Sequence, residues 1–147
     1  MTYQEKKSIV SIVSVIAIFV SFCLYMYPFP NSGLESIETF RFWGSFVFIL
    51  ILVSIIANIV INIVFNIMYR ITTGENEPTF EDELDRMINL KATRNSYFVF
   101  ILGFLLAMGS VIVFQPSQLM FMILIISGFM SDVTGSITRL YHYRKGV

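Results

Sequence analysis

Four apolar segments, each long enough to cross a lipid bilayer, dominate this 147-residue chain. A helix needs about 20 apolar residues to cross the hydrocarbon layer, and the segments cover residues 8–27, 42–69, 97–115 and 118–141. The chain is 56% hydrophobic and 14% charged, which is more apolar surface than a soluble domain of this size can bury. The sequence therefore predicts an all-α fold, an integral membrane four-helix bundle in which residues 1–147 form one domain.

Positively charged residues fall almost wholly on one side of these predicted spans. With the N-terminus inside, the cytoplasmic side holds nine of the ten: Lys6, Lys7, Arg70, Arg86, Lys91, Arg94, Arg139, Arg144 and Lys145. Only Arg41 falls on the outer side. Because short cytoplasmic loops carry the excess of Lys and Arg, we expect a multi-pass cell-membrane protein with both termini and the 70–96 loop in the cytoplasm.

The second apolar segment carries a row of asparagines. Asn58, Asn62 and Asn66 recur every four residues, so they share one slowly drifting helix face. A carboxamide left without a partner in hydrocarbon is costly, so this face should look into the bundle. Two interpretations remain open: hydrogen bonds between helices that hold the bundle together, or a polar cavity that binds a ligand.

The fourth apolar segment is the most polar, and Asp132 is the only acidic residue within a predicted span. Small residues around it form rows at four-residue spacing, which allow close approach of a neighbouring helix or of a second copy of the chain. Asp132 precedes Arg139 by seven residues and Asn62 precedes Arg70 by eight, which gives both a similar depth. We expect Asp132 to face the interior near the asparagines. The predicted intramembrane polar cluster is Asn58, Asn62, Asn66, Ser131 and Asp132.

Residues 79–96 predict an amphipathic cytoplasmic helix that leads into the third span. Thr79 is a suitable N-cap with Asp82 three residues on, and the helix either continues unbroken or bends at residues 95–96. It is either a solvated lead-in or a surface that docks a cytosolic partner. The candidate docking residues are Glu81, Asp82, Glu83, Leu84, Asp85, Met87, Ile88, Lys91 and Arg94, with Leu90 beside them on the apolar side.

The sequence offers little for catalysis, cofactors or nucleic acids. It has one cysteine, Cys23, and one histidine, His142, so a cysteine or histidine metal site is not expected. We find no nucleophile elbow, phosphate-binding loop or paired-carboxylate motif. The formal net charge is zero, which gives no basic field for direct nucleic-acid binding. We therefore expect a non-enzymatic protein without a cofactor.

The stretch DELDRMINLKATRNSYFVF, residues 82–100, resembles a family of small prokaryotic four-helix integral membrane proteins of unknown function. The family pattern is an Asp-Glu-x-Asp run, then Ile-x-Leu-Lys, an arginine and a Ser/Ala-Tyr pair before the third helix. The chain end also resembles the family's closing motif, although Lys145 stands where the family often has a second arginine. The resemblance implies a partnership with a cytosolic helix-turn-helix DNA-binding regulator.

Three functional hypotheses follow. The first is an interaction or regulatory protein whose cytoplasmic loop docks a cytosolic partner such as a DNA-binding regulator. The alternative is a small transporter or ligand-binding bundle that uses its polar interior. A third, an immunity or stress protein acting within the bilayer, also remains open.

Overall fold

The computed structural model describes residues 3–25, 27, 37–74, 83–113 and 116–145, and these form four helices. They are α1 (Tyr3–Tyr25), α2 (Ile37–Thr73), α3 (Glu83–Ile112) and α4 (Ser117–Lys145). All four are long and apolar enough to cross a membrane, and the described residues contain no strand. The predicted all-α four-helix membrane bundle is confirmed.

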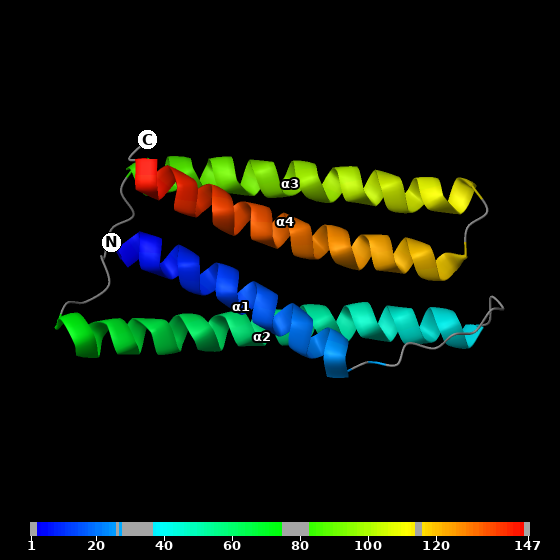
Figure 1. Ribbon diagram of the computed structural model, residues 1–147, viewed down its shortest axis with the longest axis horizontal. Coiled ribbons are helices and arrows are strands. Elements are labelled where there is room, and N and C mark those ends of the chain that lie inside the picture. Colours follow the sequence, from blue (N-terminus) through cyan, green and yellow to red (C-terminus); the bar gives the residue numbers. More distant parts are fainter. Residues whose placement is uncertain (1–2, 26, 28–36, 75–82, 114–115, 146–147) are drawn as a thin grey trace.

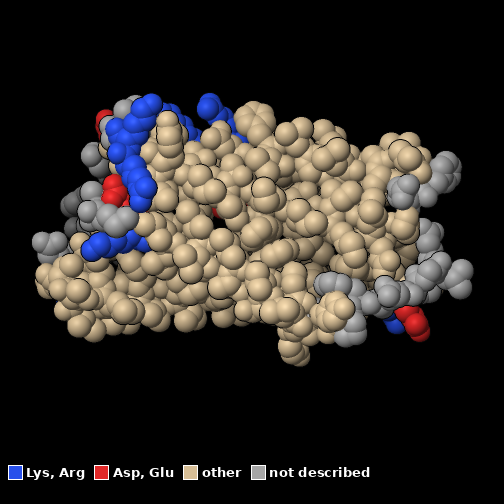
Figure 2. Space-filling model, in the orientation of Figure 1, with Lys and Arg blue, Asp and Glu red and all other residues tan. Residues whose placement is uncertain are grey.

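Consecutive helices run in opposite directions, so four helix ends gather at one end of the bundle (Figure 1). These are the N-termini of α1 and α3 and the C-termini of α2 and α4. In the space-filling view, most of the visible Lys and Arg gather at this same end, while most of the face in view is uncharged (Figure 2). This end is called the basic end below.

At the basic end all four helices extend beyond the predicted spans, because charged turns continue them past the apolar segments. At the opposite end α1 and α3 stop short of the predicted bounds, at Tyr25 and Ile112. Helix α3 runs unbroken through residues 95–96, which decides between the straight and the bent alternatives. Its 30 residues extend about 45 Å, so the first turns project beyond a hydrocarbon layer of about 30 Å. Helix α2 ends at Gly74, whose positive φ of 71° suits a glycine that caps a helix. Thr79, Glu81 and Asp82 lie outside the described residues.

Helices α3 and α4 form the closest pair, along a seam of small residues. A Cβ atom on Gly103 would overlap the side chain of Ser127, and one on Gly135 would overlap that of Ser96. The Ser96 hydroxyl donates to the carbonyl of Ser131 at 2.9 Å, and the Ser131 hydroxyl donates to the carbonyl of Ser96 at 2.8 Å. Small side chains thus let the backbones approach closely enough for reciprocal hydrogen bonds.

Helix α4 also carries α1 on a second face. The rings of Phe19 and Phe129 stack with their centroids 4.3 Å apart, and the hydroxyls of Ser11 and Ser136 lie 3.1 Å apart. Helix α3 packs closely against α4 alone among the described helices, so α4 lies at the centre of the bundle.

Helix α2 is held mainly near its two ends. Trp43 stacks on Phe121 of α4 near one end, and Tyr69 meets the ring of Tyr3 of α1 edge-on near the other. Between these contacts the apolar side chains of α2 are largely exposed, as expected for a helix that faces lipid on most of its surface. The middle of α2 therefore stands away from α3.

We predict that Gly103→Ala destabilises the protein, because the added methyl group must displace Ser127 and separate α3 from α4. Overpacking of this kind costs about 1–3 kcal/mol. Thermal unfolding of the detergent-solubilised chain measures the effect. Gly109→Ala on the same helix is the matched control, since a Cβ there meets nothing within 4 Å. Equal melting temperatures for the two variants would contradict the tight seam.

Candidate functional site: a polar cavity at the basic end

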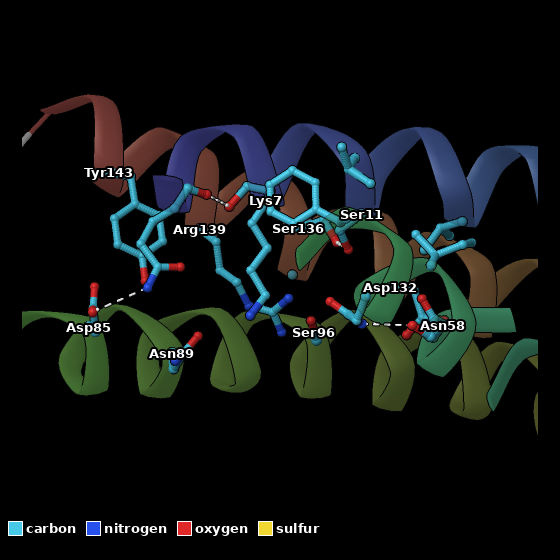
Figure 3. A pocket seen from close by; sticks show the side chains of 18 residues that line it. Lys7, Ser11, Asn58, Asp85, Asn89, Ser96, Asp132, Ser136, Arg139 and Tyr143 are labelled. Carbon is cyan, nitrogen blue, oxygen red and sulfur yellow. Dashed lines mark hydrogen bonds between the residues drawn. The ribbon is translucent and has the colours of Figure 1, made fainter. Parts of the chain in front are cut away.

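A cavity of about 560 Å³ lies between the helices, and residues from all four helices line it. Most of these residues are polar, and four of them are charged: Lys7 of α1, Asp85 of α3, and Asp132 and Arg139 of α4. Figure 3 shows Asp85 and Asp132 toward opposite ends of the cavity, with the Lys7 and Arg139 side chains extending into the space between them.

Helical periodicity explains why polar groups converge here. On α4 the lining residues Asp132, Ser136, Arg139 and Tyr143 follow at intervals of four, three and four, which keeps them on one face. Residues 85, 89 and 96 of α3 and residues 4, 8, 11 and 15 of α1 follow the same rule. Helices α1, α3 and α4 thus each turn a mainly polar row toward the cavity, whereas the α2 lining alternates asparagines with Ile61 and Phe65.

The charged groups of the cavity differ in their hydrogen-bond partners. Asp85 accepts a hydrogen bond from the side-chain amide of Gln4 at 3.4 Å. Asp132, by contrast, receives no hydrogen bond and forms no ion pair with any residue that the structure describes, and Arg139 acts on it only at longer range. The buried Nε of Arg139 also finds no acceptor among the described groups. An unsatisfied carboxylate and an unsatisfied guanidinium nitrogen therefore face the same cavity.

One interpretation of the asparagine row was hydrogen bonding between helices, and for Asn58 and Asn62 the structure shows hydrogen bonds within α2 instead. Asn58 donates to the carbonyl of Ser54 at 2.9 Å, and Asn62 donates to the carbonyl of Asn58 at 2.7 Å. Both amides thus use their own helix, because the carbonyl four residues back is within reach. Only Asn66 has a bond across helices, accepting from the Tyr3 hydroxyl. Asn58 and Asn62 line the cavity, whereas Asn66 lies outside its lining.

The predicted cluster is divided between two faces of α4. Asp132 lines the cavity together with Asn58 and Asn62, while its neighbour Ser131 is buried in the seam against α3. Sequence reasoning missed Lys7, Asn89, Ser96, Ser136, Arg139 and Tyr143 as lining residues, and placed Asp85 on a docking surface. The spacing of four from Asp85 to Asn89, followed by Ser96, was a signal for an inward polar row.

The predicted docking residues also fall on different sides of α3. Ile88 is 1% exposed and Asp85 faces the cavity, whereas Met87 and Leu90 are 56% and 64% exposed. Ala92, which is fully buried, lies on the side of Ile88 and lets α4 approach there. The remaining described docking residues are exposed at Glu83, Leu84 and Arg94 and half-buried at Lys91.

The polar groups of the cavity are carboxylates, amides, hydroxyls and two cations, and this set suits hydrogen bonding and charge pairing. Within the described ranges, no three His, Cys, Asp or Glu side chains gather closely enough to hold a metal ion.

We predict that Asp132→Asn raises the melting temperature of the purified protein. The change removes a charge that receives no hydrogen bond from the described residues, and a charge at the middle of a membrane span costs about 2.5–3.5 kcal/mol on insertion scales. This figure is an upper limit for Asp132, because Arg139 acts on it at longer range. Ser131→Ala is the neighbouring control and should lower the melting temperature, because it removes a hydrogen bond of the seam. A lower melting temperature for Asp132→Asn would mean that this carboxylate stabilises the fold.

Comparison with known proteins found no family model, curated protein or solved structure that matches this chain. The family resemblance described above stays a prediction.

Proposed function

We propose that this chain is a non-enzymatic membrane bundle that binds a small polar solute carrying both a positive and a negative group. The observation that carries the proposal is the cavity into which two cations and two carboxylates project from three different helices. A small solute is bound by a concave site with a few well-placed polar groups, and this cavity is large enough for one.

The arrangement of the charges supports a solute of this type. Lys7 and Arg139 offer donors for an acidic group in the middle of the cavity, and Asp132 offers an acceptor for a positive group at one end. The amides of Asn58 and Asn62 are engaged through their nitrogens, which leaves their oxygens available as acceptors. A ligand with charges of both signs would therefore supply partners for the Asp132 carboxylate and for the Nε of Arg139, which the described residues leave without a hydrogen bond.

The proposal includes an orientation. Nine of the ten Lys and Arg residues belong to the segments that meet at the basic end, and this bias supports a cytoplasmic location for that end in a cell membrane. The solute would then enter from the cytoplasm.

We predict that a zwitterionic solute stabilises the purified full-length protein against heat. A ligand that binds only the folded state, at 100 times its dissociation constant, adds about 2.7 kcal/mol. The measurement is a thermal-shift screen with free amino acids and small betaines. Arg139→Gln should abolish the shift.

Arg144→Gln is the matched control for this screen, since Arg144 lies five residues further along α4 and is exposed. If no zwitterion shifts the melting temperature, or if both variants respond alike, the proposed solute site is wrong.

A second candidate function, docking of a cytosolic partner, is supported by the outer face of α3 near the basic end. Met87 and Leu90 are exposed there, between the exposed charged residues Glu83 and Arg94 that share their face. An apolar stripe with a charged residue at either end suits a helix that packs across it. The family resemblance implies a helix-turn-helix DNA-binding regulator as the partner.

We predict that a photo-crosslinking amino acid at position 87 captures a protein with a helix-turn-helix domain in native membranes, identified by mass spectrometry. The same amino acid at position 89, which faces the cavity, is the control and should not capture that protein. Equal capture from both positions, or capture only of proteins without such a domain, would count against docking at this face.

A further inference from the structure

A second hollow runs along the middle of the bundle, and most of its lining residues differ from those of the polar cavity. This groove has a volume of about 1020 Å³, and its walls come mainly from α2 and α4, with α1 and α3 completing it. It exists because α2 is held near its ends and α3 packs closely only on α4. Phe48 and Ile51 on its α2 wall are 65% and 53% exposed, so the groove opens toward the lipid-facing side.

The lining of the groove is aromatic. Six phenylalanines from all four helices contribute to it: Phe19, Phe48, Phe100, Phe104, Phe121 and Phe129. The face of an aromatic ring attracts a cation, and it does so more strongly where water is excluded. The groove therefore favours a large apolar body, and it favours one that is positively charged.

The groove has a charged lining residue at one place, where it meets the polar cavity. Asp132, Asn58 and Val15 line both the groove and the polar cavity, so they mark the junction of the two spaces. Figure 3 shows Asp132 and Asn58 beside each other, far from Asp85. Asp132 is the one charged residue among the described residues that line the groove, and it has no bonded partner among them.

We propose that the groove binds a lipophilic cation, whose apolar body lies among the phenylalanines and whose positive charge lies at Asp132. Charge complementarity favours this occupant over a lipid acyl chain or an apolar face of a second copy, because neither of those would neutralise the carboxylate. Entry from the lipid side matches the solubility of such a compound. The proposal goes beyond the polar solute site and does not depend on it.

The test is equilibrium binding of tetraphenylphosphonium to the detergent-purified full-length chain, measured by isothermal titration calorimetry. We expect saturable binding that Asp132→Asn weakens by about tenfold or more, as for loss of a close charge partner. Neutral triphenylphosphine oxide, which has a similar aromatic body, should bind at least about tenfold more weakly to the unmodified chain. Asp85→Asn, which changes an acid of the polar cavity outside the groove, should leave phosphonium binding unchanged.

A steric variant tests the location of binding without touching the charge. Gly128 lines the groove, and a Cβ there meets nothing within 4 Å, so Gly128→Leu should fill the groove without disturbing the helices and should weaken binding by about tenfold or more. Gly109→Leu, outside the groove lining and also unobstructed at Cβ, is the control. Thermal unfolding checks that each variant is folded.

The outcomes separate the possible occupants. Equal binding of the neutral compound would identify a groove for any apolar body, including a lipid chain, and would overturn the proposal. Absence of saturable phosphonium binding, for example because a second copy covers the groove, would overturn it as well. Binding that survives Gly128→Leu would place the cation elsewhere. Failure of the zwitterion screen would leave this proposal standing, since Lys7 and Arg139 take no part in the groove.

Discussion

The close contact between α3 and α4 determines where the polar cavity and the groove can form in this bundle. Glycines that face serine side chains, together with the reciprocal hydrogen bonds of Ser96 and Ser131, draw the two backbones together. Without a hydrophobic force between helices in lipid, such packing and hydrogen bonding are the main sources of association. Because α4 uses this face for α3, its adjacent faces remain for α1, the cavity and the groove.

The position of α2 follows from different chemistry. Aromatic rings near its two ends contact α4 and α1, and the asparagines do little to draw α2 inward, because Asn58 and Asn62 bond to their own backbone. The space between α2 and α3 therefore follows from where α2 carries its aromatic and asparagine side chains. We expect the carboxylate of Asp132 at the edge of that space to reduce stability, and residues that do so are typical of functional sites.

Much of this architecture could be predicted from hydropathy, because four apolar runs of bilayer length permit few folds. The inward position of Asp132 beside Asn58 and Asn62 also followed from helical spacing and depth. Which face of α3 meets α4 could not be predicted, since Ile88 and Leu90 are equally apolar and the choice depends on the small Ala92 and on the neighbour's glycines. The separation of Ser131 from Asp132 likewise depends on the rotation of α4, which a single sequence does not specify.

The shared lining at Asp132 links the two proposed sites. One carboxylate can neutralise one positive charge, so the positive group of a solute in the cavity and a lipophilic cation in the groove would compete for it. Binding linkage is reciprocal, so each ligand would weaken the other by the same factor. The solute's acidic group, held between Lys7 and Arg139, would not take part in this competition, because neither residue lines the groove. A solute without a positive group would then bind the cavity independently of the groove, and only zwitterionic or cationic solutes would be coupled to it.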